Sequence, residues 1–480
     1  MPSANKSNHQ SDKKKRPSHR HAPPSIPRPQ LRMVLKGIIR SHRSGGSWNP
    51  VAGCTVLTAG CTNCYNMENV MGSMISLAVG RFEIEWGKNN GFVDHSALFQ
   101  PSDLTQIPYY YAGGKVEMQD GLSKPLPLVI DRINLLGHTP ATCEQEFAAL
   151  GAYHEMDQER FSFSDLQRAL AIVDVTAMSP DYGEGGEDFG KFFRREIFPR
   201  IGLEGIVNDT RFAQFDAAYA MENLSAYTIL HLLAANPTAQ SLRVQWAFKD
   251  VEEGGWAKRS DFIRTVDQAA RFLIVTEGSS DAAIIGKAFR LLRPHIADFF
   301  DFVDMEEGYP FSGTGNVFRF VQGLISIRVL NNVLVIYDND AEGVANHERT
   351  RALNLPSNMR TMKLPDLPRF ERFPAVGPNG TYEANINGQA AAIECYLHLN
   401  DDARVRWSSY NSKIGAYQGE LIGKEDYTRN FLDQRRKEPS YRYENIEAVL
   451  DLVVREAVAM REAVTAAAYA ADYEDRLMSS

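Results

Sequence analysis

Cysteine is scarce in this sequence, with only five among 480 residues. This number is too small for the disulfide scaffold that stabilises many small secreted proteins, so that class of protein is excluded. Cysteine usage of this kind is typical of a protein that works in a reducing compartment. We therefore expect the protein to be cytoplasmic.

Long apolar runs are missing as well. The strongly apolar runs, among them residues 272–275 (FLIV) and 333–337 (VLVIY), are much shorter than the ~20 residues that a transmembrane helix needs. We therefore expect neither a membrane-spanning segment nor a membrane partner. The hydrophobic fraction of 44% is still ample for two or three packed domains.

The chain also lacks an overall excess of basic residues, because 52 Lys and Arg stand against 60 Asp and Glu. The basic residues are unevenly placed: residues 1–50 hold 11 of them and a single acid, Asp12. The rest of the chain therefore has a net charge of −18. Such an acidic body argues against indiscriminate coating of nucleic acid, although a site with a bound metal ion can still accept a phosphate backbone.

Residues 1–47 are rich in Ser, Pro, His, Lys and Arg and show almost no apolar periodicity. This composition predicts a disordered basic tail. The tail is either an electrostatic arm for nucleic acid or a solvated extension, and we favour the extension because basic blocks are common in unstructured tails.

Three of the five cysteines, Cys54, Cys61 and Cys64, lie in residues 48–70 with the spacing Cys-x6-Cys-x2-Cys. This spacing can bring three thiolates to one zinc ion or iron–sulfur cluster and leaves one coordination position open. The segment resembles the three-cysteine motif of phage-related proteins that are radical-SAM-like. Besides the thiols, the matching residues are Trp48, Asn49, Pro50 and Gly53.

The body of a radical-SAM domain does not follow this motif, and a different domain begins at Met71. We therefore interpret residues 1–70 as a remnant or an over-extended reading frame. A zinc ion or iron–sulfur cluster at the three thiols is the less favoured interpretation.

Residues 71–265 are predicted to form an α+β domain. Residues 71–92 alternate between apolar and polar side chains, which predicts two short strands joined near Gly80 and closed by an Asn-Asn-Gly turn. Residues 144–174 and 210–235 have apolar side chains at every third or fourth position, which predicts helices.

Residues 266–400 alternate between short apolar strands and helical stretches. This order predicts an α/β domain with a parallel sheet and right-handed crossovers. Ligands of such sheets bind beyond the carboxyl ends of the strands. The predicted strands read RFLIVTEG, FFDFVD, NVLVIYDND and MRTMKL, and the predicted helices span about residues 280–292, 317–326 and 342–353.

Acidic residues follow two of these strands at that edge. Glu277 follows the first strand, and Asp338 and Asp340 follow the third. If the two strands are neighbours, the three carboxylates converge, and Asp338 and Asp340 share a face because one residue separates them. Carboxylate oxygens suit a hard divalent cation, Mg²⁺ or Mn²⁺, which relieves their mutual repulsion and attracts a phosphate oxygen.

Three further acids are candidates near the same edge. Asp281 either adds an oxygen behind the metal ligands or caps the following helix, and we favour capping. Glu342 and Glu394 are either additional ligands or acids that face solvent or cap helices.

Two stretches around these acids resemble the motifs of a Toprim domain, the catalytic module of topoisomerases, primases and overcoming-lysogenisation-defect nucleases. VTEGSSD is similar to its first motif and VIYDNDAEG to its second. The resemblance implies a Rossmann-like parallel sheet. It also implies that Glu277 is the general acid/base or a metal-linked acid, and that Asp338 and Asp340 hold Mg²⁺ during phosphodiester chemistry.

The resemblance extends over roughly residues 71–399. MGSMISLAVGRFEIEWGKNNGFVDHSALF resembles the N-terminal module of the HEPN/Toprim-associated family, bacterial proteins thought to act against phage or other invaders. The expected function is therefore Mg²⁺-dependent cleavage of DNA or RNA in a defence system. The alternatives are a sensor or adaptor that binds nucleotide or nucleic acid without turnover, and a structural domain with incidental acids.

Residues 401–480 are predicted to be helical. In residues 443–477 apolar side chains return with helical spacing in an Ala- and Glu-rich stretch, which predicts a long amphipathic helix. This helix packs either on the body of the protein or on a second copy of the chain, so a homo-oligomer is an expected assembly.

Overall fold

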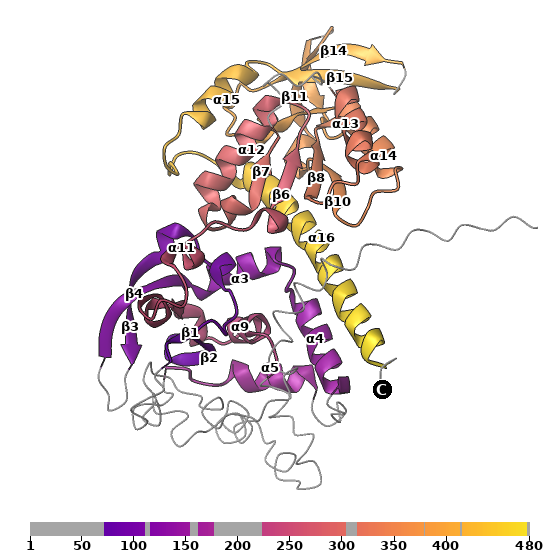
Figure 1. Ribbon diagram of the computed structural model, residues 1–480. Helices are drawn as coiled ribbons and strands as arrows, with labels where there is room; N and C mark the ends of the chain where they lie inside the picture. The colour runs from indigo at the N-terminus through magenta and orange to yellow at the C-terminus, as the bar shows by residue number, and fades with distance from the viewer. Residues whose placement is uncertain are drawn as a thin grey trace, which may run out of the picture. The chain divides into compact units, whose positions relative to one another are not determined.

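The structure of the chain is a computed structural model (Figure 1). It describes residues 72–110, 116–153, 162–176, 223–303, 314–378, 380–412 and 415–477. All of these belong to one compact unit that spans residues 47–480. The predicted basic tail and the thiols of Cys54, Cys61 and Cys64 lie outside the described residues.

An antiparallel five-stranded sheet forms the first part of the described chain, with the strand order β2-β1-β5-β4-β3. The predicted hairpin at residues 71–92 is confirmed, and Gly80 adopts a φ of +59° in its turn. The strand of this sheet that comes last in the sequence, residues 243–247, lies in the middle of the sheet, and its Trp246 is buried. The strands are β1 (Met74–Val79), β2 (Phe82–Lys88), β3 (Leu104–Tyr110), β4 (Val116–Pro125) and β5 (Arg243–Ala247).

Helices pack on this sheet and share one apolar core with it, in which Trp246, Phe82, Phe99 and Phe248 are among the largest buried side chains. Helices are present in both predicted ranges, 144–174 and 210–235, as far as these are described. The α-helices are α3 (Leu126–Leu135), α4 (Pro140–Tyr153), α5 (Phe163–Ala171), α9 (Ala226–Ala234), α10 (Lys249–Glu253) and α11 (Arg259–Phe262).

A parallel four-stranded sheet follows, with the order β10-β8-β6-β7. The first and third predicted strands are neighbours, since β6 pairs with β8 from Phe272↔Asn332 to Val275↔Val335. The strands are β6 (Phe272–Val275), β7 (Phe300–Phe302), β8 (Asn332–Tyr337) and β10 (Met359–Lys363). The helices between them are α12 (Ser279–Leu292), α13 (Thr314–Ser326) and α14 (Ala341–Arg351).

Both faces of this sheet are covered, which explains the uninterrupted apolar run of β8. Val333, Val335 and Tyr337 point into a core shared with α13. Leu334 and Ile336 point into the opposite core, which contains α12. Figure 1 shows α12 on one side of the strands and α13 and α14 on the other. The prediction of a parallel α/β sheet at residues 266–400 is therefore confirmed.

The chain then adds a second four-stranded sheet of order β12-β11-β14-β15 and a small two-stranded sheet. The strands of the first are β11 (Phe373–Gly377), β12 (Gly380–Ala384), β14 (Val405–Asn411) and β15 (Ala416–Leu421). The small sheet pairs β9 (Asn339–Asp340) with β13 (Ala390–Ala391). The 3₁₀ helices are η2 (Ser96–Leu98), η3 (Pro101–Asp103), η8 (Ala239–Ser241), η9 (Gln268–Ala270), η10 (Pro294–Phe299), η11 (Pro368–Phe370) and η12 (Ile393–Tyr396).

The structure corrects the prediction of an entirely helical region at residues 401–480. Residues 405–421 form the β14–β15 hairpin, because Val405 and Leu421 alternate with exposed Arg406 and Glu420 and turn toward the core. Only the later part is helical, in α15 (Lys424–Leu432) and α16 (Glu444–Leu477).

Helix α16 packs on the body of the same chain, which is one of the two predicted arrangements. Ile446, Val449, Leu450 and Val453 are fully buried in the core that also contains α12. The helix extends further to contact α3 and α4. No helix in the described ranges has the length and apolar composition that crossing a membrane requires.

A buried arginine joins α3 to η10. Arg132 is 0% exposed, and its Nη1 and Nη2 lie 2.7 and 3.0 Å from the carboxylate oxygens of Asp298. The same guanidinium donates to the backbone oxygens of Ala97, Phe99 and His295 and lies over the ring of Phe299. Helix α3 follows β4 of the antiparallel sheet and η10 follows α12, so this pair fastens the first part of the chain to the second.

The half-buried His138 should make the stability of the fold decrease in acid. Burial, together with the charges of the nearby Arg461 and His231, lowers the pKa of His138 from 6.5 to about 4. The depressed pKa means that stability present above pH 6.5 is lost as the pH falls toward 4, by about 3 kcal/mol for a shift of this size.

We expect His138→Gln to remove that acid-dependent loss. The free energy of unfolding is measured with urea at pH 7 and at pH 4.5. Between these two pH values, wild type should lose more stability than the variant. The same difference between wild type and variant at both pH values would contradict the prediction.

Candidate active site

The candidate site begins where β6 ends and α12 starts. Glu277 lies two residues after the last residue of the strand, and Gly278 is the residue before the first helical turn. The backbone N–H of Gly278 donates to Oδ2 of Asp281 at 2.9 Å. Asp281 therefore caps α12, the role that the sequence favoured for it, and it is also 9% exposed, so it is a buried acid.

The end of β8 brings two further acids to the same place. The backbone N–H of Asp338 donates to Oε1 of Glu277 at 3.3 Å, so the two strand ends meet as predicted. Oδ1 of Asp340 accepts the N–H of Gly343 at 2.6 Å and caps α14. A side chain at Gly343 would put its Cβ 2.3 Å from the carbonyl oxygen of Asp338, so only glycine fits this turn.

A third segment, η12, closes the other side of the site. The backbone N–H of Ile393 donates to Oδ1 of Asp338 at 3.1 Å. The next residue, Glu394, is 7% exposed, and its charge raises the pKa of both Asp281 and Asp338. Glu394 is therefore a buried member of the cluster and does not face solvent. Glu342, in the first turn of α14, is half-buried and acts on the pKa of Glu277 and Asp340.

We call these six residues the acid cluster: Glu277, Asp281, Asp338, Asp340, Glu342 and Glu394. Burial, followed by the charges of Asp340 and Asp281, raises the pKa of Glu277 to about 9. Burial and Glu394 raise the pKa of Asp281 to about 7.

The same causes act on the other members. Burial raises the pKa of Asp340 and Glu394 and, with the neighbouring acids, that of Asp338 well above its usual value. The cluster therefore holds more negative charge than its surroundings compensate.

Positive potential comes from several directions. The N-termini of α12 and α14, with their partly positive helix dipoles, lie at the cluster. Lys424, at the start of α15, lowers the pKa of Glu394 and so lies within electrostatic reach. These groups are what an incoming phosphate requires beside the carboxylates.

The donor chemistry of the cluster fits a hard divalent cation, because carboxylate oxygens from separate segments meet and repel one another. The arrangement is not that of a finished coordination shell: among the described residues, no group of three or more His, Cys, Asp or Glu side chains is placed to hold a metal ion. Backbone N–H groups fix one oxygen each of Asp281, Asp338 and Asp340.

Sequence reasoning missed a polar support directly behind the two aspartates. Asn339, between them, is fully buried and donates through Nδ2 to Asp366 at 2.9 Å. Its Oδ1 accepts from Nζ of Lys363 and from the N–H of Gly388, both at 2.9 Å. The only signal in the sequence was its position: in an extended Asp-x-Asp segment the middle side chain points away from the two acids.

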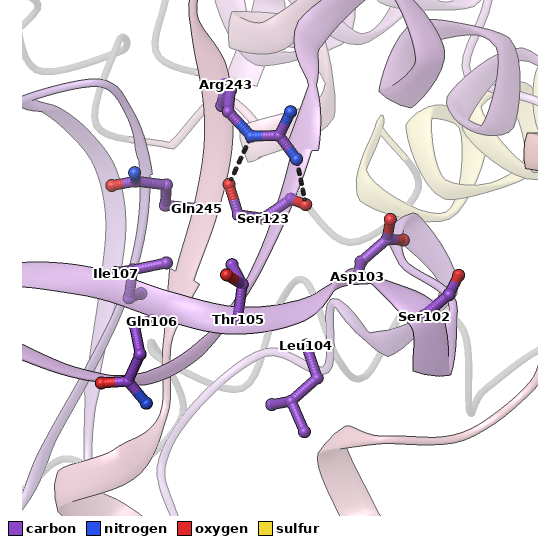
Figure 2. A pocket seen from close by; sticks show the side chains of 9 residues that line it. All are labelled: Ser102, Asp103, Leu104, Thr105, Gln106, Ile107, Ser123, Arg243 and Gln245. Carbon is purple, nitrogen blue, oxygen red and sulfur yellow. Dashed lines mark hydrogen bonds between the residues drawn. The ribbon is translucent and has the colours of Figure 1, made fainter.

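A separate pocket of about 480 Å³ lies on the antiparallel sheet (Figure 2). Arg243 donates through Nε to Oγ of Ser123 at 2.8 Å and through Nη2 to its carbonyl oxygen at 2.7 Å. None of the acid cluster lines this pocket. The lining residues are Ser102, Asp103, Leu104, Thr105, Gln106, Ile107, Ser123, Arg243 and Gln245.

Comparison with known proteins identifies the first part of the chain. Residues 71–270 match the family described as HEPN/Toprim N-terminal domain 1. The match covers the antiparallel sheet with its helices and ends just before β6. Neither the curated proteins nor the solved structures gave a match. The match confirms the N-terminal part of the prediction from the sequence: residues 71–270 are similar to the N-terminal domain of HEPN/Toprim-associated proteins.

Proposed function

We propose that this chain is a Toprim-type, divalent-metal-dependent nuclease that cleaves phosphodiester bonds of DNA or RNA. The observation that carries the proposal is the 3.3 Å contact between Oε1 of Glu277 and the N–H of Asp338. It joins two acidic segments 61 residues apart at the carboxyl edge of a parallel sheet. The HEPN/Toprim-associated family supports a setting in bacterial defence, and we propose a cytoplasmic location.

Asp338 and Asp340 are the proposed ligands of Mg²⁺ or Mn²⁺, with Glu277 beside them. When bound, the ion supplies positive charge that polarises a phosphate oxygen. The pKa of Glu277, about 9 without a cation, falls when positive charge is near, and a carboxyl with a pKa closer to neutrality can both give and take a proton. Asp281 and Glu394 add negative charge behind the ligands, and the N-termini of α12 and α14 orient the phosphate.

A second candidate function is a sensor or adaptor that binds nucleotide or nucleic acid without turnover. One observation favours it, namely that the acids of the described residues do not form a finished metal shell. The two functions differ in turnover alone.

Turnover is measured with the purified full chain and labelled single-stranded and double-stranded DNA and RNA, with Mg²⁺ or Mn²⁺ against EDTA. We expect shorter products on denaturing gels only with the metal. Binding without any cleavage of these substrates would favour the sensor.

Metal binding should also stabilise the fold. Mg²⁺ that binds the native cluster and not the unfolded chain adds about 2.7 kcal/mol at a hundred times its dissociation constant. We expect Tm to rise with Mg²⁺ concentration relative to EDTA, in a melt followed by circular dichroism. A structural domain with incidental acids predicts instead an unchanged Tm at every concentration.

A further inference from the structure

The β14–β15 hairpin carries aromatic side chains that the described part of the chain leaves largely exposed. Tyr410 and Tyr417 are 56% and 57% exposed, and their ring centroids lie 5.0 Å apart. The ring of Trp407 lies 6.3 Å from that of Tyr417 and is half-buried. We call Trp407, Tyr410 and Tyr417 the aromatic stripe.

The register of the hairpin explains why the three rings share one face. Trp407 pairs with Gly419, and Tyr410 pairs with Tyr417. Tyr410 is three positions after Trp407, which in a regular strand would place them on opposite faces. The irregularity between Trp407 and Ser409 inserts one extra residue, so Tyr410 returns to the face of Trp407.

One end of the stripe lies beside the acid cluster. A Cβ at Gly419 would lie 3.0 Å from Cβ of Ala390 and 3.0 Å from Cε3 of Trp407, so this face of the hairpin rests directly on β13. Ala390 is in turn the strand partner of Asp340. The stripe therefore starts one strand away from a proposed metal ligand and leads outward from it.

The composition of the stripe indicates which ligand it suits. Its three members are Trp and Tyr, whose flat faces stack on nucleobases. Between Trp407 and Tyr410 along β14 stand two exposed serines, Ser408 and Ser409.

Charge at the inner end supports the same ligand. Lys424 follows β15 and acts on Glu394, so the stripe ends where positive potential and the helix N-termini favour a phosphate. A nucleic acid with its backbone at the cluster would thus reach the rings with its next bases. Those bases must be unpaired, because rings can stack only on exposed base faces.

We propose that the aromatic stripe stacks with unpaired bases of a single-stranded nucleic acid whose backbone lies at the acid cluster. This inference rests on the proposed function for the identity of the ligand, and it adds the substrate class: single strands, or duplexes with a single-stranded end.

The test is binding without turnover. Anisotropy of labelled oligo-dT, oligo-U and a blunt duplex is measured with the full chain and with Tyr410→Ala/Tyr417→Ala in Ca²⁺, a hard divalent cation that carboxylates bind, and intact oligonucleotide on a denaturing gel verifies that no turnover occurs. Stacking contributes about 1–3 kcal/mol per base, so the double variant should bind both single strands at least about tenfold more weakly. Tyr410→Phe/Tyr417→Phe keeps the rings and should bind like wild type.

Tyr382→Ala is the matched control, since Tyr382 is 49% exposed on β12 at the far edge of the same sheet. If wild type, the double alanine variant and this control bind single strands with equal affinity, the aromatic stripe does not stack with bases, even if the protein cleaves nucleic acid. A change from dimer to monomer in the double variant, by sedimentation, with unchanged affinity would assign the stripe to a second copy instead. If binding depends on the aromatic stripe but no cleavage occurs in Mg²⁺, the proposed nuclease activity is refuted and the proposed stacking is not.

Discussion

Asp338→Asn and Asp340→Asn should each reduce Mg²⁺-dependent cleavage at least about 100-fold, the equivalent of about 2.7 kcal/mol of transition-state stabilisation. Each change removes one negative charge from the proposed ligand pair. Asparagine keeps the oxygen that accepts the N–H of Ile393 at position 338 and of Gly343 at position 340. The loss of activity should therefore occur without loss of the local hydrogen bonds.

The same variants should be at least as stable as wild type in EDTA. Burial and neighbouring acids raise the pKa values of the cluster, so removing one charge relieves repulsion in the metal-free protein. We also expect the Mg²⁺-dependent rise in Tm to disappear. Cleavage and thermal melts on the same preparations measure both effects.

Glu348→Gln is the matched control. Glu348 lies on α14, the helix that Asp340 caps, but at its far end, and its side chain is 57% exposed. It should cleave and respond to Mg²⁺ like wild type. Retained Mg²⁺-dependent cleavage in a folded Asp338→Asn/Asp340→Asn protein would refute the assignment of the metal site.

Much of the parallel sheet could be predicted from the sequence because its signals are local. The apolar run of β8 and the acid that follows it indicate a buried strand ending at a functional edge. Asp281, three residues after Gly278, has the spacing of a helix cap, and the structure shows that hydrogen bond.

The parts that were missed depend on contacts between distant residues. Glu394 was ambiguous because only the packing of η12 against Asp338, 55 residues earlier, buries it. β5 pairs between β1 and β4, an order that no spacing along the chain reveals. The β14–β15 hairpin was predicted as helix because an irregularity in β14 interrupts the alternation that indicates a strand.

Arg132→Met should destabilise the protein by about 3–5 kcal/mol, the cost of removing one partner of a buried ion pair. Methionine leaves the carboxylate of Asp298, which is 17% exposed, without its cation. It also leaves the carbonyl oxygens of Ala97, Phe99 and His295 without the donors that satisfy them. Urea unfolding at neutral pH measures the loss.

A neighbouring arginine provides the control. Arg293 pairs with Asp451 at 2.6 Å, but that carboxylate is 61% exposed, so Arg293→Met should cost less than about 1 kcal/mol. Arg132→Met/Asp298→Leu removes both charges and should recover part of the loss, because the unpaired buried carboxylate is gone. If Arg132→Met lowers the free energy of unfolding no more than Arg293→Met does, the pair of Arg132 and Asp298 does not hold α3 to η10. A large cost that the double variant relieves would instead show that Arg132 and Asp298 interact directly across α3 and η10.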